Sequence, residues 1–432
     1  MWRWLYTLAI RAAAPFILAR LWWRGRREPF YRRRIGERFG HYRDGVPRRL
    51  GAAPYNRPVL WIHAVSVGEA RASAALARSL AAANTGHELL LTCMTAAGRE
   101  TLRELHGESA RIAWLPYDYP GAVRRFLEHF RPRLGVLMET EIWPNLLAAC
   151  ASHGVPVLLA SARMSEKSAL GYRRWSALAR PAFASLAAVC AQSEEDAQRL
   201  RALGARSVEV AGNLKFDSAP EANGRAEGAA WRARLGRPVL LLASTREGEE
   251  KMLLDAMPAW DEKLLVLIVP RHPRRFDEVA VLSVKDGFPA ARRSREPMPA
   301  AKDRVHLGDT MGEMDFYYAA ADVAVIGGSF VPRGGQNLIE ACAAGVPVVL
   351  GPSMFNFAEA TRLALEAGAA IQAADAASAI REALRLLLNA EERTRMGAAG
   401  KQFCEAHRGA TRKHQLVCAR LLKGAATVAT RD

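Results

Sequence analysis

The sequence lacks the short motifs on which several enzyme classes depend. It contains no Asp-x-Asp pair, no Walker lysine motif and no Gly-x-Ser-x-Gly turn. Metal-dependent sugar transferases, P-loop nucleotidases and serine hydrolases therefore lose support as functional classes. No repeat of fixed short period is visible either.

Cysteine is scarce and scattered through apolar runs. No pair forms Cys-x-x-Cys, and no group of Cys and His has the spacing of a zinc site. We expect reduced core residues in a cytosolic compartment, and no metal centre. The six are Cys93, Cys150, Cys190, Cys342, Cys404 and Cys418.

A long apolar run without charge is also missing. Residues 1–23 are mostly apolar but contain Arg11, Pro15 and Arg20, whereas a spanning helix needs about 20 apolar residues free of central charge. Four tryptophans bracket the stretch, as interfacial aromatic residues do, and no small-residue cleavage site follows. We therefore assign residues 1–30 to membrane attachment, as a short uncleaved anchor or as an amphipathic helix in the interface. A buried core helix with outward-reaching Arg is the alternative.

Negative charge is scarce at this end of the chain. Residues 1–50 hold thirteen Arg and no Lys against three acidic residues, within a net charge of +17 for the whole chain. Nucleic acid, an anionic membrane surface and an acidic substrate are the partners that such charge suits. The tryptophans favour the membrane surface, with Arg24–Arg34 on its cytoplasmic side, and we expect no nucleic-acid partner.

Short apolar segments alternate with helical stretches along the rest of the chain, which indicates parallel sheets covered on both faces. In the first half the predicted strands are Val59–Ala64, Glu88–Met94, Arg111–Leu115, Leu134–Met138, Val155–Ala160, Ala187–Ala191 and Ser207–Ala211. In the second half they are Val239–Ala243, Leu264–Val269, Val305–Leu307, Val323–Ile326, Val346–Leu350 and Ala369–Gln372.

The alternating pattern breaks once. Residues 216–236 combine Gly, Pro, Ala and charges without a strand signal, which is typical of a linker. We therefore predict an α/β fold of two Rossmann-like, doubly wound domains, 31–215 and 237–400, facing each other across a cleft. Residues 285–304 are predicted to form a polar loop. Residues 401–432 are predicted to be a basic helix that packs back on the first domain.

Charged side chains follow three predicted strands of the first half. Glu69 opens a helix after a glycine turn, and it either removes a proton from an acceptor hydroxyl or only complements the helix dipole. Glu139 and Glu141 flank a threonine at a strand end, where they orient a partner or act as ordinary helix N-terminal acids. Lys215 follows the last strand, where it either meets an anion or is solvated.

The second half carries residues suited to a nucleotide. Pro270 and Arg271 end a strand in a stiff turn that aims the guanidinium for bidentate phosphate contact. Glycine turns then lead into a helix predicted to begin near Asn337. The glycine turns are expected to let backbone amides approach an anion, the helix N-terminus to favour phosphate, and Glu340 to accept hydrogen bonds from a ribose.

Six segments resemble the 3-deoxy-D-manno-octulosonic acid (Kdo) transferases, lipopolysaccharide enzymes of the GT-B architecture. The resemblance runs in order from the amino-terminal apolar segment to about residue 400. The segments are HAVSVGE (63–69), METEIWPN (138–145), GNLKFD (212–217), VPRHPRR (269–275), GDTMGEM (308–314) and GGSFVPRGGQN (327–337).

The resemblance implies an activity and a site. The donor is expected to be CMP-Kdo, and the acceptor a lipid A precursor (lipid IVA) on the cytoplasmic face of the inner membrane. Glu69 matches the family's general base, and Glu139 and Lys215 match residues that stabilise the transition state. The family works without a metal, and no cofactor is expected. The CMP-binding segments correspond to Pro270, Arg271, Gly312, Glu313, Met314, Asn337, Leu338, Ile339 and Glu340.

Two positions depart from the family pattern. Gln336 stands where the family usually has His, and an amide does not titrate near neutral pH, so donor affinity is the property most affected. The strand end Thr92–Thr95 carries fewer Thr than usual. Two rival functions stay open: a GT-B transferase that uses a UDP-sugar, and a non-catalytic membrane scaffold that binds nucleotide or anionic lipid.

Overall fold

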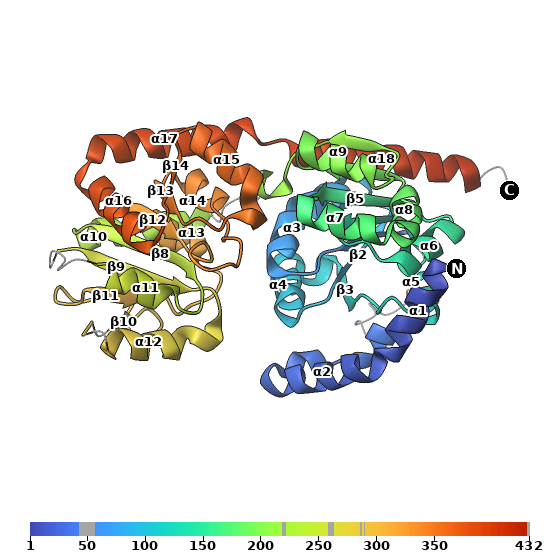
Figure 1. Cartoon of the computed structure of the whole chain (residues 1–432), viewed down its shortest axis with the longest axis horizontal. Helices are drawn as coiled ribbons and strands as arrows, with labels where there is room; N and C mark the ends of the chain where they lie inside the picture. Colours follow the sequence, from blue (N-terminus) through green and yellow to red (C-terminus); the bar gives the residue numbers. More distant parts are fainter. Residues whose placement is uncertain (43–56, 218–221, 258–262, 286, 289, 430–432) are drawn as a thin grey trace. The chain divides into compact units, whose positions relative to one another are not determined.

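Two α/β units make up the chain (Figure 1). The computed structural model describes residues 1–42, 57–217, 222–257, 263–285, 287–288 and 290–429. Unit 1 comprises Met1–Ser218 together with Arg408–Asp432, and unit 2 comprises Ala219–His407. The chain therefore enters unit 2 once and returns to unit 1 for its last segment.

Unit 1 is built on a seven-stranded parallel sheet of order β3-β2-β1-β4-β5-β6-β7. The direction in which successive strands are added reverses between β1 and β4, and ligands of open parallel sheets bind at such a reversal point. The strands are β1 (Val59–His63), β2 (Glu88–Cys93), β3 (Arg111–Trp114), β4 (Pro132–Met138), β5 (Val157–Ala162), β6 (Ala188–Ala191) and β7 (Val208–Val210).

Helices cover both faces of this sheet. Alternate residues of β1 point to opposite faces, so Trp61 packs in an apolar cluster with Phe126, whereas Ile62 packs in a second cluster with Leu76. The helices are α1 (Trp2–Ala12), α2 (Ala14–Arg27), η1 (Pro29–Arg32), η2 (Ile35–Phe39), α3 (Val67–Ala83), α4 (Ala96–His106), η3 (Gly107–Ser109), α5 (Pro120–Phe130), α6 (Pro144–Ser152), α7 (Glu166–Arg174), α8 (Ser176–Ala184), α9 (Glu194–Ala202), η4 (Leu214–Asp217) and α18 (Ala410–Ala429).

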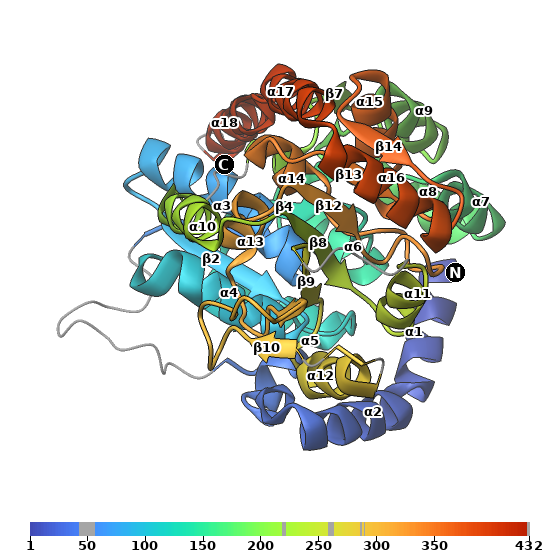
Figure 2. The ribbon, with the colours of Figure 1, turned by 90° about the vertical axis from the view of Figure 1, so that its left-hand side faces the viewer.

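Unit 2 repeats the architecture with a second seven-stranded parallel sheet (Figure 2). Its order is β10-β11-β9-β8-β12-β13-β14, so the reversal point lies between β8 and β12. The strands are β8 (Val239–Thr245), β9 (Leu265–Pro270), β10 (Ala290–Arg292), β11 (Val305–Leu307), β12 (Val323–Ile326), β13 (Val348–Leu350) and β14 (Ala370–Gln372). The helices are α10 (Ala222–Leu235), α11 (Glu249–Asp255), η5 (Pro273–Arg275), α12 (Phe276–Lys285), α13 (Met314–Ala319), α14 (Ile339–Ala344), η6 (Phe355–Phe357), α15 (Ala358–Glu366), α16 (Ala376–Leu388) and α17 (Ala390–Ala406).

The predicted strands are all present, with ends shifted by a few residues. Strand β10 was missed because it is only three residues long and lies among prolines and charges, within the predicted polar loop 285–304. A single edge strand of this length leaves too few apolar residues for a periodic signal.

The predicted linker is wrong over most of its length. Residues 222–235 form helix α10, which packs against α13, and Trp231 is buried there. Gly228 allows the close approach, because a Cβ at this position would lie 2.2 Å from the carbonyl oxygen of Phe316. Gly228 therefore allows two helices to pack closely and does not mark a flexible segment. Residues 218–221 of the predicted linker lie outside the described residues.

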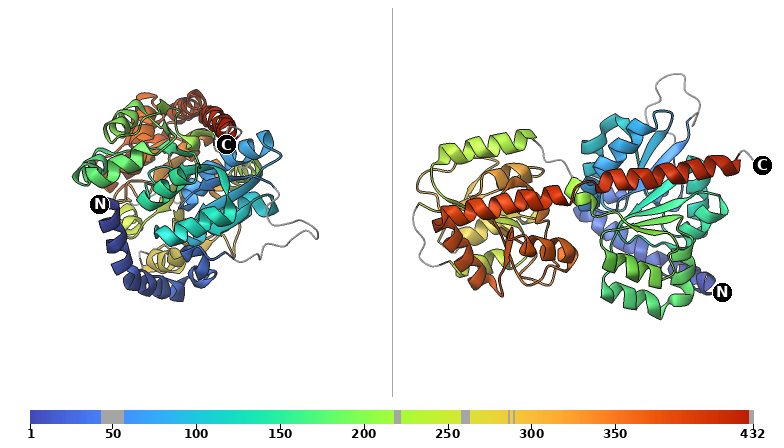
Figure 3. Two further views of the ribbon diagram at one scale, coloured as in Figure 1. Left: turned by 90° about the vertical axis from the view of Figure 1, so that its right-hand side faces the viewer. Right: turned by 90° about the horizontal axis from the view of Figure 1, so that it is seen from above.

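The last helix of the chain lies on unit 1 (Figure 3). Helix α18 contacts α3, β4 and η4, and its Val417 and Cys418 are buried in the same apolar cluster as Ile62. The return to unit 1 begins later than the predicted residue 401, because α17 continues to Ala406 within unit 2.

Helices α1 and α2 lie on unit 1 but are not the buried core helix that was one alternative. Thr7 of α1 is hydrogen-bonded to Asn145 at 3.0 Å, and Tyr119 donates to the carbonyl oxygen of Ile10 at 3.1 Å. Large apolar side chains on both helices are nevertheless exposed. Among the described residues no single helix is long and apolar enough to cross a membrane. The pair Trp2–Ala12 and Ala14–Arg26, bent by 47°, has the necessary length and composition together.

Candidate functional site

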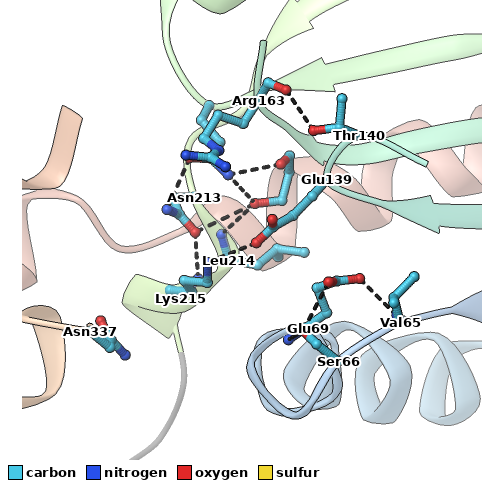
Figure 4. Close-up of polar contacts among 12 residues, drawn as sticks. Val65, Ser66, Glu69, Glu139, Thr140, Arg163, Asn213, Leu214, Lys215 and Asn337 are labelled. Carbon is cyan, nitrogen blue, oxygen red and sulfur yellow. Dashed lines mark hydrogen bonds and ion pairs between the residues drawn. The ribbon is translucent and has the colours of Figure 1, made fainter. Parts of the chain in front are cut away.

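Glu69 lies at the reversal point of the unit 1 sheet, in the first turn of α3 (Figure 4). Its Oε2 accepts a hydrogen bond from Val65 N at 2.8 Å, and its Oε1 accepts one from the Ser66 hydroxyl at 2.9 Å. Ser66 also caps α3 by accepting from Glu69 N at 3.4 Å. The local Ser-x-x-Glu sequence thus forms a variant of the capping box, which fixes the carboxylate beside the end of β1.

The Glu69 carboxyl is difficult to ionise. Only 9% of the residue is exposed. Its pKa is raised to about 7, first by burial and then by the nearby carboxylates of Glu139 and Glu141, which together outweigh the hydrogen bonds from Val65 and Ser66. A carboxyl of this kind exchanges a proton readily near neutral pH.

Glu139, at the end of β4, is charged because a cation lies against it. Lys215 Nζ donates to Glu139 Oε1 at 2.7 Å. Burial by itself would raise the pKa of Glu139, but Lys215, with a contribution from Arg163, lowers it below the ordinary value. The pKa values of these two nearby glutamates are therefore shifted in opposite directions, as in paired acid and base sites. The solvated-lysine alternative for Lys215 is excluded.

The strand ends that carry these residues have unusual backbone conformations. Glu139 has a φ of 58° and Ser161, at the end of β5, a φ of 49°. Non-glycine residues rarely adopt this left-handed region, at a cost on the order of 1 kcal/mol, and they concentrate at functional sites. The conformation of Glu139 is held by its N–H, which donates to Ala160 O at 2.9 Å.

The second residue of the acidic pair has a local role. Glu141 Oε2 accepts a hydrogen bond from Trp143 Nε1 at 2.6 Å. Burial raises the pKa of Glu141, the Trp143 bond lowers it and the charge of Glu139 raises it. Glu141 therefore adds to the negative surroundings of Glu69.

In unit 2, the predicted nucleotide residues follow the carboxyl ends of β9, β11 and β12. Arg271 follows β9, and its Nε donates to Gln336 Oε1 at 3.2 Å. Asn337 Nδ2 donates to Glu340 Oε1 at 3.0 Å. The residue that departs from the family pattern, Gln336, thus orients the arginine expected to contact phosphate.

Further arginines surround this edge of the sheet. The pKa of His272 is lowered to about 4, first by burial and then by the charges of Arg246, Arg271 and Arg274. The pKa of Arg246 is also lowered, first by burial and then by the positive charge of Arg333. Several cations so close together are stable only beside an anion or in contact with water, and this arrangement suits a phosphate.

The glycine turns do not play the predicted part. Gly328 N and Phe330 N donate to the fully buried carboxylate of Glu249, at 2.6 and 2.9 Å, and Gly335 N donates to Gly328 O at 2.8 Å. These amides are therefore occupied within the protein and do not face a phosphate. The helix also starts later than predicted, since α14 begins at Ile339.

Three further predicted residues, Glu313, Leu338 and Ile339, lie in two different environments. Glu313 is paired with Arg293, whose Nε donates to it at 2.8 Å, just before α13. Leu338 and Ile339 are buried core residues, so their side chains are not available to a ligand.

Sequence reasoning missed Ser161 and Arg163 in unit 1, and Arg246 and Glu249 in unit 2. Arg163 and Arg246 directly follow a buried strand, Ser161 lies one residue before the end of β5, and Glu249 opens the helix after β8, so all four lie near a strand end as Glu69 and Glu139 do. Their contacts depend on residues far along the chain and carry no local pattern. Among the residues that the structure describes, no three His, Cys, Asp or Glu side chains gather in a way that fits a metal ion.

Similar sequences are known over nearly the whole chain. Residues 33–218 match the family described as 3-deoxy-D-manno-octulosonic-acid transferase (kdotransferase), and residues 299–403 match glycosyl transferases group 1. The chain is 48% identical to the 3-deoxy-D-manno-octulosonic acid transferase of Bordetella pertussis, over 96% of this chain and 98% of that one. It is 34% identical to the enzyme of the same name from Haemophilus influenzae, over 96% and 97%.

A solved structure shares the fold across both units. It is a glycosyltransferase from Rickettsia africae, with a TM-score of 0.59 and 13% identity over 85% of this chain and all (100%) of that one. At this identity the likeness shows the GT-B-like arrangement of two parallel α/β domains, and says nothing of the substrate.

The raised pKa of Glu69 predicts a stability change with a definite sign. Because its folded pKa is above its unfolded value, the folded state binds the extra proton, and the free energy of unfolding falls as pH rises through the window from the ordinary value to about 7. Glu69→Gln removes the titrating carboxyl, and with it this fall in the free energy of unfolding. The variant should be more stable than wild type by on the order of 2 kcal/mol at about pH 8, with the difference shrinking toward about pH 5.

Urea unfolding at both pH values measures this difference, and Glu104→Gln, an exposed carboxyl on α4, is the matched control. A Glu69→Gln variant less stable than wild type at both pH values would show that the hydrogen bonds of the carboxylate outweigh its desolvation.

Proposed function

We propose, from the premise that this chain belongs to the 3-deoxy-D-manno-octulosonic acid transferase family, that it moves Kdo from CMP-Kdo to a lipid A precursor such as lipid IVA. The chain is a glycosyltransferase, which joins a sugar carbon to an acceptor oxygen. The identities of the donor and acceptor, and the roles of single residues, are the inferred part.

One observation carries the proposal. A carboxyl with a pKa of about 7, Glu69, lies next to the ion pair of Glu139 and Lys215 at the reversal point of a parallel sheet. A general base works best when its pKa lies near the working pH, because it is then both available as the base and strong enough to take the proton. This arrangement supports Glu69 as the base.

In the proposed reaction, Glu69 takes the proton of an acceptor hydroxyl while that oxygen bonds to the anomeric carbon of Kdo. The bond from this carbon to the CMP phosphate breaks, and the phosphate keeps the bonding electrons. Lys215, oriented by Glu139 at 2.7 Å, stabilises the negative charge of the transition state.

The arginines of unit 2 support an anionic donor. Arg271 would contact the departing phosphate, together with backbone amides near Asn337, while Glu340 would meet the ribose. We propose a reaction without metal or cofactor, because the Asp-x-Asp motif is missing and arginines supply the positive charge. Because the glycine amides are occupied, we propose Arg271 as the principal phosphate contact.

We also propose that α1 and α2 attach the enzyme to the cytoplasmic face of the inner membrane, where a lipid acceptor would be found. Aromatic and aliphatic side chains partition into the interface, and the nearby arginines suit anionic headgroups. Exposed apolar residues on these helices are Trp2, Trp4, Leu5, Leu8, Phe16, Leu18, Trp22 and Trp23.

Incubation of the protein with CMP-Kdo and a lipid A precursor should give a product heavier by whole Kdo units in mass spectrometry, and no product from UDP-sugars. Glu69→Gln should lower turnover by about 10²–10⁴-fold, the usual contribution of a positioned base. Binding of CMP, measured by calorimetry, should not change in this variant, and Glu104→Gln should retain full turnover.

Transfer from a UDP-sugar with none from CMP-Kdo would replace the donor. No transfer from any donor would favour the membrane scaffold, in conflict with the family. Turnover of Glu69→Gln within about tenfold of wild type would exclude Glu69 as the base.

The membrane proposal is tested by Trp4→Ser combined with Phe16→Ser. Loss of two exposed aromatic groups should weaken binding to vesicles that contain anionic phospholipid by at least about tenfold, since one buried aromatic side chain contributes roughly 1.5–3 kcal/mol. Flotation with vesicles measures the bound fraction. Leu388→Ser, at an exposed position of α16 in unit 2, is the control. Equal binding of all three proteins would contradict attachment through α1 and α2.

A further inference from the structure

His414, on the last helix of the chain, has both ring nitrogens engaged in hydrogen bonds. The residue is fully buried in α18, Nε2 accepts from Ser161 N at 2.9 Å, and Nδ1 lies 2.7 Å from Ala410 O. A carbonyl oxygen only accepts and an amide N–H only donates, so the ring is the neutral tautomer with its proton on Nδ1. Burial lowers the pKa of His414, which favours this neutral form.

The partner of His414 is the strained residue at the end of β5. The register between β5 and β6 shifts between Leu159 and Ala162, and Ser161 lies within the shift with a φ of 49°. The N–H of Ser161 points to His414 instead of a neighbouring strand. A buried N–H needs an acceptor, so the imidazole stabilises the left-handed conformation of Ser161.

Ser161 connects in turn to the segment that carries Lys215. Its Oγ accepts from Leu214 N at 3.4 Å and donates to Asn213 Oδ1 at 3.4 Å. The same Asn213 oxygen accepts from Lys215 N at 2.9 Å. Ser161 and Asn213 thus connect His414 to the backbone of Lys215, and Figure 4 shows the contact between Asn213 and Lys215.

A second contact fixes the other end of the same turn. Asp217, at the end of η4, accepts hydrogen bonds from Gly409 N at 2.8 Å and from Thr411 N, at the start of α18. Helix α18 therefore holds η4 at Asp217 and, through Ser161, at Leu214, with Lys215 between these two points.

We propose that His414 is a positioning residue for Lys215: it fixes Ser161, which sets where the Lys215 ammonium lies against Glu139. The proposal rests on the proposed function, because it gives Lys215 its importance. It assigns to the returning helix a part in the transfer step, in addition to packing.

The test compares His414→Leu with His414→Gln. Leucine leaves Ser161 N without an acceptor, whereas a glutamine amide oxygen reaches close to the position of Nε2 and its NH₂ replaces the other donor. His414→Leu should lower kcat by at least about tenfold with little change in the donor KM, since small displacements of a charged group at a reacting centre are costly. His414→Gln should retain most of the wild-type kcat.

Two further variants separate positioning from loss of structure. Val417→Ala, one turn along α18 and also buried, should lower the unfolding temperature but leave kcat unchanged. Ser161→Ala removes only the hydroxyl of the connection, and it should lower kcat without a comparable loss of stability, even where His414→Leu fails to fold.

The dependence on Lys215 decides the outcome. In a Lys215→Ala background, His414→Leu should have no further effect on kcat, which is the non-additivity of residues acting as one unit. A full additional loss in that background, an equal loss in Val417→Ala, or an unchanged kcat in Ser161→Ala would each overturn the proposal. Full activity of Lys215→Ala alone would instead refute the role of Lys215 in the proposed function.

Discussion

The hydrogen-bonded ion pair between Lys215 and Glu139, at 2.7 Å, is the interaction on which the site of unit 1 depends. Without its cation, the desolvation of Glu139 would act unopposed and raise its pKa, which would weaken the charge that it sets beside Glu69. With the cation in place, one glutamate is charged and its neighbour has a pKa of about 7. The short contact with Lys215 lowers the pKa of Glu139, whereas burial raises the pKa of Glu69, so two residues of the same type have different chemical roles.

The fold explains how residues so far apart in sequence meet. In both sheets the order of addition reverses once, and the strands on either side of that point carry the site residues: Glu69 after β1 and Glu139 after β4 in unit 1. In unit 2, Glu249 after β8 holds the glycine turn that follows β12. Parallel strands place all their carboxyl ends on one edge, so short loops suffice to bring these groups together. The returning α18 adds a support that neither sheet supplies.

Sequence patterns predicted the strands and the strand-end positions of Glu69, Glu139 and Arg271, because buried apolar runs and the polar residues after them are local features. They did not predict the roles of the glycines. Gly228 lies where α10 packs closely on α13, and the amide of Gly328 donates to Glu249. Neither role can be predicted from the local sequence, because each depends on a residue far along the chain. The pairing of His414 with Ser161, 253 residues apart, has no sequence signal for the same reason. The glycine-rich segments suggested a flexible linker and phosphate binding, whereas in the structure these two glycines make tertiary contacts within the protein.

The most direct test of the account is a carbon-13 NMR titration of the glutamate carboxyls in the wild-type protein and in Lys215→Met. In the wild type, Glu69 should titrate near 7 and Glu139 below the ordinary range of a glutamate. In Lys215→Met, the pKa of Glu139 should rise sharply, because burial then acts without its opposing cation. A wild-type Glu69 that titrates in the ordinary range, or a Glu139 that does not respond to the loss of Lys215, would contradict the central claim.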